Sequence, residues 1–170
     1  MSGTVSPSSG TSSFRASPVP DRSAGLLLFR RAGGGLELFL VHPGGPFWAN
    51  KDDGAWSIPK GLYEDGEDAL AAARRECAEE VGTPVDGDVI ALGEFRLPSG
   101  KRLSAWAIEG DLDPATVASN TFEMEWPPRS GKRAQFPEVD RAAWFEPDVA
   151  RRKLTKGQLP LLAAFLRLPR

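Results

Sequence analysis

The sequence predicts an α/β domain built on a mixed sheet, and the spacing of its apolar residues supports this fold class. Two short apolar runs, 25–29 and 36–41, flank three consecutive glycines and predict a β-hairpin. A helical period covers residues 68–81, and a second helix is expected near the C-terminus, with an apolar face made of Leu161, Leu162, Phe165 and Leu166. Further strands are expected at 89–95, 103–108, 121–126 and 142–145. These elements allow a mixed sheet flanked by at least two helices.

The composition indicates one domain with an N-terminal tail. Residues 1–23 are rich in Ser, Pro and Gly, so we expect a disordered tail, followed by a single domain over residues 24–170. The net charge of −2 provides no global field for nucleic acid, and no apolar run approaches the roughly 20 residues of a membrane span. We therefore expect that the protein binds neither nucleic acid nor a membrane, and that it is cytoplasmic. The sequence does not indicate the oligomeric state.

The lone cysteine and the lone histidine narrow the chemistry. With Cys77 and His42 as the only residues of their kinds, an internal disulfide and a zinc site with several such ligands are excluded. Cys77 also falls on the expected buried stripe of the first helix, with Leu70, Ala73 and Val81. It is therefore interpreted as a small core residue and not as a nucleophile.

The same helix carries three closely spaced glutamates. Glu76, Glu79 and Glu80 lie within an arc of about 100 degrees, where like charges repel unless a cation offsets them. Oxygen-only ligands on a rigid element suit Mg²⁺ or Mn²⁺ and hence phosphate chemistry. The alternative is an ordinary solvated acidic helix face.

The surrounding residues favour the metal site over the solvated face. The pattern G-x5-E-x7-R-E-x-x-E-E-x-G is met by Gly61, Glu67, Arg75, Glu76, Glu79, Glu80 and Gly82. This pattern resembles the Nudix box of MutT-like hydrolases, and Thr83 is a mild departure after the helix. The segments 56–61, 137–140 and 144–145 also resemble strands of that family. The Pro-Lys-Gly form ending at Gly61 is similar to that of the branch acting on diadenosine or diphosphoinositol polyphosphates.

The resemblance implies a Nudix α/β/α sandwich with a central mixed sheet, and Mg²⁺-dependent hydrolysis of a diphosphate linkage. It assigns Glu76, Glu79 and Glu80 to metal binding and catalysis, and suggests a metal-facing carbonyl and a tight turn at Gly61. Glu67 and Arg75 would pair to hold the motif together, and Gly82 would end its helix.

A carboxylate outside the motif is often needed as a further ligand or base. Glu125 is our first candidate, with Glu123 and Glu138 as the others. Glu123 and Glu125 should share one face of a strand, because they are two residues apart. The alternative is that both face solvent and pair with Arg129, Lys132 or Arg133.

The substrate is expected to be a nucleotide or polyphosphate, with Lys60 and Arg133 as candidate phosphate ligands. Phe47 and Trp48, in the loop 42–54, could stack on a base or cover the edge of the core. Dinucleoside polyphosphates rank first as substrates. The alternatives are a nucleoside triphosphate and a non-hydrolysing Nudix domain that senses a nucleotide, while RNA 5′ ends rank lower.

Overall fold

The structure is a computed structural model that describes residues 22–169, so most of the expected tail lies outside the described residues. Arg22 and Ser23, which we placed in that tail, instead open the first strand. The elements, in chain order, are β1 (Arg22–Ala32), β2 (Gly35–Pro43), β3 (Lys60–Tyr63), α1 (Ala69–Val81), β4 (Val89–Arg96), β5 (Arg102–Glu109), η1 (Pro114–Thr116), β6 (Thr121–Glu125), β7 (Arg133–Pro137), β8 (Val139–Phe145), α2 (Pro147–Lys153), η2 (Lys156–Gln158) and α3 (Leu159–Leu166).

The main sheet has six strands in the order β4-β5-β1-β2-β8, with β3 also paired to β1. The β1–β5 pair is parallel and the other pairs are antiparallel, which confirms the expected mixed sheet. On one edge, β1 pairs with β3 through residues 22–25 and with β2 through residues 29–32. The sheet therefore splits between β2 and β3, and the segment that carries Lys60 enters at the split.

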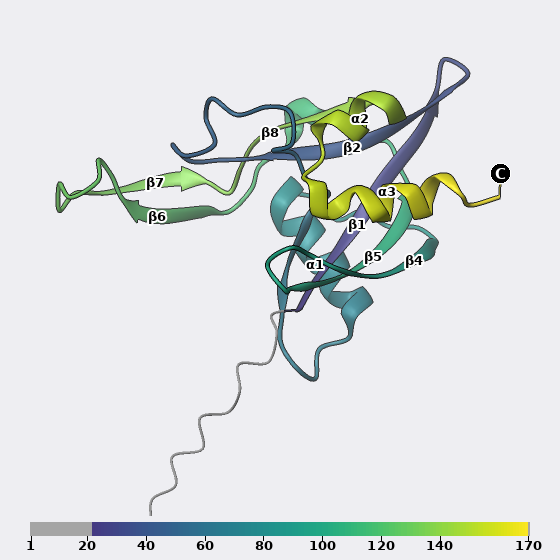
Figure 1. Ribbon diagram of the computed structural model, residues 1–170, viewed down its shortest axis with the longest axis horizontal. Coiled ribbons are helices and arrows are strands. Elements are labelled where there is room, and N and C mark those ends of the chain that lie inside the picture. Colours follow the sequence, from purple (N-terminus) through teal and green to yellow (C-terminus); the bar gives the residue numbers. More distant parts are fainter. Residues whose placement is uncertain (1–21, 170) are drawn as a thin grey trace, which may run out of the picture.

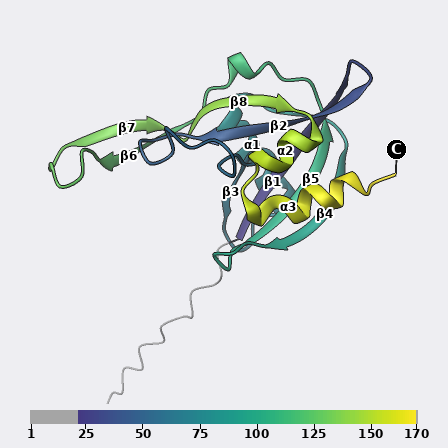
Figure 2. The same ribbon diagram turned by 45° about the horizontal axis from the view of Figure 1, so that its top comes forward.

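Both faces of the sheet are covered, because β1 buries its side chains on each side. Leu27 and Phe29 belong to the core under α2 and α3, whereas Leu26 and Leu28 belong to the core under α1. The alternation follows from the two-residue period of a strand. Figures 1 and 2 show α2 and α3 together on one side, which completes the helix–sheet–helix layering.

The first helix forms as the sequence predicts. The side chain of Asp68 accepts a hydrogen bond from Ala71 N at the start, and Gly82 ends the helix with φ of 84°. Cys77 is buried, and burial raises the pKa of its thiol to about 12, so it is a core residue. Leu70 is only half-buried, and Ala72 lies in the core beside the predicted stripe.

Strands β6 and β7 form a separate two-stranded sheet that projects from the side of the domain (Figure 1). The segment 121–126 was expected to be a strand, but β7 and the short helix α2 were not foreseen. Their sequences, RAQFP and PDVARRK, lack a long apolar period. No helix within residues 22–169 is long and apolar enough to cross a membrane.

Candidate functional site

Arg75 connects the helix α1 to the loop before it. Its Nε and Nη2 donate to the two carboxylate oxygens of Glu67, at 2.9 and 3.2 Å. Its Nη1 donates to Glu76 at 2.8 Å and to Glu79 at 3.3 Å. The bond from Arg75 holds the pKa of Glu67 below its usual range. The expected pair is thus present, and Arg75 also sets the direction of two of the motif's glutamates.

Gly61 lies directly against the carboxylate of Glu76. A Cβ at this position would be 1.9 Å from Glu76 Oε2, far inside van der Waals contact. Its φ is not in the left-handed region, so glycine is required here for space and not for the tight turn that we expected. The close approach places the β3 backbone beside the acidic face of α1.

Glu80 points inward beneath the same strand. The backbone N–H of Lys60 donates to Glu80 Oε2 at 3.2 Å. Burial raises the pKa of Glu80 to about 8, and the charges of Glu76 and Glu138 act in the same direction. Burial also raises the pKa of Glu76, to which Glu79 and Glu138 contribute. We call Glu76, Glu80 and Glu138 the carboxylate cluster.

The carboxylate cluster suits a hard divalent cation in chemistry but is not arranged as a finished metal site. Within residues 22–169 no three acidic, His or Cys side chains converge in a geometry that holds an ion. The expected three-glutamate site is not preformed, because Arg75 holds one oxygen of Glu76 and one of Glu79 while Glu80 turns to Lys60. The donors are all oxygen, and burial, with a smaller contribution from their mutual repulsion, raises the pKa values of Glu76 and Glu80; a bound cation would favour their charged forms.

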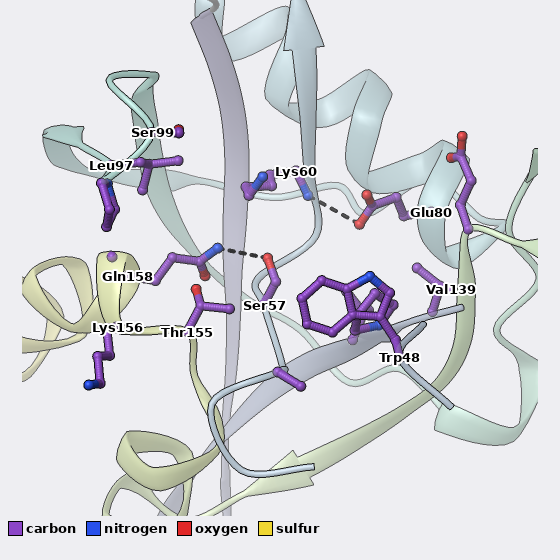
Figure 3. A pocket seen from close by; sticks show the side chains of 16 residues that line it. Trp48, Ser57, Lys60, Glu80, Leu97, Ser99, Val139, Thr155, Lys156 and Gln158 are labelled. Carbon is purple, nitrogen blue, oxygen red and sulfur yellow. Dashed lines mark hydrogen bonds between the residues drawn. The ribbon is translucent and has the colours of Figure 1, made fainter. Parts of the chain in front are cut away.

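A pocket of about 620 Å³ opens beside Glu80 and Glu138. Figure 3 shows Trp48 lying below Glu80 in this view, with Lys60 on the other side of the strand segment. Burial lowers the pKa of Lys60, which lines the pocket. A phosphate bound in the pocket would favour the charged form of Lys60 and would meet that ammonium beside Glu80.

Gln158 and Ser57 form the opposite wall and were missed by the sequence analysis. Gln158 is buried, accepts a hydrogen bond from Ile58 N at 3.0 Å and donates to Ser57 Oγ at 2.8 Å. Gln158 and Ser57 are 101 positions apart in the chain. No local pattern marks such a pair, so only the folded chain shows it.

His42 holds in place the loop of residues 44–54, which carries Phe47 and Trp48 and which we call the aromatic loop. The sequence did not indicate this role. The ring of His42 is fully buried, with Nδ1 2.8 Å from Asp140 Oδ1 and Nε2 2.6 Å from the carbonyl oxygen of Lys51. Phe47 and Trp48 project from this loop with 62% and 39% of their surface exposed. Both side chains are therefore accessible to a ligand.

Three of the predicted residues lie elsewhere. Glu123 and Glu125 share a face of β6, as expected, but Phe122 and Met124 are the β6 residues that line a pocket. Glu125 accepts a hydrogen bond from Gly131 N at 3.1 Å, and Arg133 binds Glu123. Glu125 and Arg133 line neither the pocket beside Glu80 and Glu138 nor the adjacent one that Phe122 and Met124 line. Our first choices for a base and a phosphate ligand on this hairpin are therefore not supported, whereas Glu138, the third candidate base, lies in the cluster.

The comparisons agree with the motif and the fold. The chain matches the family model described as the NUDIX domain over residues 19–165, and it therefore belongs to the Nudix family.

Several solved structures share this fold. A C. elegans Ap4A hydrolase in a binary complex is 22% identical with a TM-score of 0.59, covering 86% of this chain and 95% of that one. The NUDIX domain of Shewanella oneidensis NrtR complexed with ADP ribose is 16% identical with a TM-score of 0.57, covering 87% of each chain. A mutT/nudix family protein from Listeria innocua is 19% identical with a TM-score of 0.57, covering 87% of this chain and 93% of that one. At these identities the likeness is one of fold.

Proposed function

We propose that this protein is a Mg²⁺-dependent pyrophosphohydrolase that cleaves a diphosphate linkage in a nucleotide, with dinucleoside polyphosphates as its first-ranked substrates. One observation carries the proposal: two members of the carboxylate cluster, Glu80 and Glu138, line the pocket that Lys60 and Trp48 also line. A site for hydrolysing an anhydride needs negative ligands for a cation, a positive group for phosphate and a surface for the base. This pocket combines all three.

The residues divide into distinct roles. Glu76 and Glu80, with Glu79 beside them and the Gly61 carbonyl opposite, would hold the cation; Mn²⁺ would suit the same oxygen donors. Bound there, the ion would acidify a water and neutralise charge on the diphosphate. Arg75 keeps the motif's loop and helix together through Glu67.

Glu138 is the proposed general base. It is at the pocket wall, where its carboxylate can take a proton from a water that attacks phosphorus. Lys60, which lines the same pocket, would bind a phosphate of the substrate. Because the nucleophile is water, no covalent intermediate is needed, which agrees with a buried Cys77.

The substrate ranking rests on Trp48. Its indole lies in the pocket near Glu80, at a place where a base could stack on it (Figure 3). The similarity in fold to a protein named Ap4A hydrolase supports a dinucleoside polyphosphate, and the similarity to a domain complexed with ADP ribose supports a nucleotide more broadly.

A substrate panel tests the proposal. The purified protein with Mg²⁺ is given diadenosine polyphosphates, nucleoside triphosphates, nucleoside diphosphate sugars and diphosphoinositol polyphosphates, and the phosphate-bearing products are identified. We expect diadenosine polyphosphates to be cleaved with the highest kcat/KM. Preference for triphosphates would change the substrate and leave the reaction class intact. Binding of nucleotides without any cleavage would instead contradict the enzyme and favour a sensor.

A further inference from the structure

A second pocket of about 470 Å³ lies next to the first, between the aromatic loop and the β6–β7 hairpin. It is lined by Pro43, Gly44, Gly45, Pro46, Phe47, Trp48, Phe122, Met124 and Glu138. Apart from Glu138 these residues are uncharged, and none of the lining residues is a cation. Such a pocket suits a neutral planar group and does not suit a phosphate.

Two glycines fix the loop against the hairpin and give this pocket its shape. A Cβ at Gly44 would be 1.9 Å from the carbonyl oxygen of Pro137, and a Cβ at Gly45 would be 2.8 Å from Cζ of Phe122. Gly44 N also donates to the carbonyl oxygen of Glu138 at 3.0 Å. The loop and the base of the hairpin are therefore in direct backbone contact, so the pocket between them is a built feature.

The alternation of β6 supplies the aromatic and apolar wall. Phe122 and Met124 face the loop, whereas the acidic residues of the strand face away. Just after the end of the strand, the rings of Trp126 and Phe47 form a T-shaped pair with 5.8 Å between their centroids. Phe47 is 62% exposed although it is a large apolar side chain, and the second pocket is the concave surface that it borders.

The two pockets share a wall. Pro43, Trp48 and Glu138 line both of them, so the proposed base stands where one pocket meets the other. A ligand that occupies both would pass its middle part over Glu138 and its ends to either side of Trp48. In a hydrolase of polyphosphates, the middle part is the one that contains the scissile bond.

We propose that the second pocket binds a second planar ring of the substrate, so that the site takes two ring-bearing nucleosides joined by a polyphosphate. This inference rests on the proposed function and adds to it the place of the second ring. One ring stacks on Trp48 in the first pocket, and the other lies between Phe47 and the apolar face of β6, which Phe122 and Met124 form. The polyphosphate joins them across the carboxylate cluster, near Lys60.

The test compares Phe47→Ala with the wild type on diadenosine tetraphosphate and adenosine 5′-tetraphosphate, which differ by one nucleoside. Loss of the stacking ring should lower the ratio of kcat/KM for the two-ring over the one-ring compound by about tenfold, with most of the change in KM. Phe47→Trp should restore the ratio. Ile90→Ala removes an exposed apolar side chain on β4 and should leave both values unchanged. An equal effect of Phe47→Ala on both compounds, or none on either, would overturn the proposal.

A binding measurement separates this inference from the proposed function. Calorimetry with Glu80→Gln and the same two compounds detects the second ring without any turnover. The second pocket predicts tighter binding of diadenosine tetraphosphate, and Phe47→Ala in the Glu80→Gln background should remove that advantage. If the wild type cleaves nothing yet this difference persists, the reaction is refuted and the subsite stands. If cleavage occurs but the two compounds bind equally, the subsite is refuted and the reaction stands.

Discussion

Glu138 and Glu125 differ in which neighbours the fold gives them. Glu138 follows β7 and lines both pockets, whereas Glu125 sits on the face of β6 that carries the acidic residues. We expect Glu138→Gln to lower kcat by at least about a hundredfold, because it removes a base. Glu125→Gln, the matched control, should stay within about twofold in the same steady-state assay. If Glu125→Gln lowered kcat more than Glu138→Gln, the general base would be Glu125 on the β6–β7 hairpin.

At Gly61, the addition of a single Cβ atom is expected to affect cation binding. An added Cβ would displace the carboxylate of Glu76, yet the displaced group is the flexible end of a side chain. Gly61→Ala should therefore raise the Mg²⁺ concentration for half-maximal activity by about tenfold or more. The free energy of unfolding should change by less than about 1 kcal/mol.

Gly35→Ala is the matched control for this change. A Cβ there would be 3.7 Å from the carbonyl oxygen of Ala32, which is ordinary contact, so the Mg²⁺ titration should be unchanged. If Gly61→Ala titrates like Gly35→Ala, the close approach to Glu76 has no part in cation binding.

The helix α1 carries the glutamates of the motif, and the side chain of Asp68 caps its N-terminus. Asp68 accepts from Ala71 N at 3.0 Å, which satisfies one of the helix's free N–H groups. Asp68→Ala should lower the free energy of unfolding by about 1 kcal/mol in urea denaturation. Asp88→Ala removes an exposed carboxylate outside the helix and should change it by less than about 0.5 kcal/mol. Equal effects would show that capping does not stabilise this helix in the folded domain.

The aromatic loop depends on His42 in a comparable way. The buried ring joins β2 to Lys51 in the loop and to Asp140 in β8, and His42→Ala would leave both partners without it. We expect a loss of about 2 kcal/mol in the free energy of unfolding and faster hydrogen exchange over residues 44–54. Asp140→Asn keeps an oxygen acceptor and should have a smaller effect on both measurements. Unchanged exchange in the His42 variant would mean that the loop is held by other contacts.

At the scale of the whole molecule, the site forms where the sheet divides. Because β1 pairs with β3 along one half and with β2 along the other, Pro59 and Lys60 approach β1 at the split, where Leu26 N donates to Pro59 O at 3.1 Å. The helix α1 covers this region from one face, and β8 begins beside it. The topology thus brings together residues from three separate segments of the chain.

The sequence predicted the parts of this arrangement that lie close together in the chain. The motif from Gly61 to Gly82 and the glycine that ends its helix depend on local spacing, and the resemblance to the Nudix box implied the pair of Arg75 with Glu67. The position of Glu138 depends on where β7 ends and β8 begins, and no period marks that junction. The partners of Gln158 depend on contacts across most of the chain.

Even within the motif, spacing alone gave an incomplete picture. It placed three glutamates on one side of the helix, but it could not show that Arg75 holds two of them while Glu80 turns to the backbone of Lys60. Side-chain directions follow from competing hydrogen bonds, which the sequence pattern does not rank.

The central claim is that the carboxylate cluster makes this protein a metal-dependent hydrolase. The most direct test is the initial rate of diadenosine tetraphosphate cleavage as a function of Mg²⁺ for the wild type, Glu80→Gln and the exposed control Glu109→Gln. We expect Mg²⁺-dependent cleavage by the wild type and the control, and a loss of at least about a hundredfold in Glu80→Gln. Cleavage by Glu80→Gln at the wild-type rate, or a wild-type rate independent of Mg²⁺, would contradict the claim.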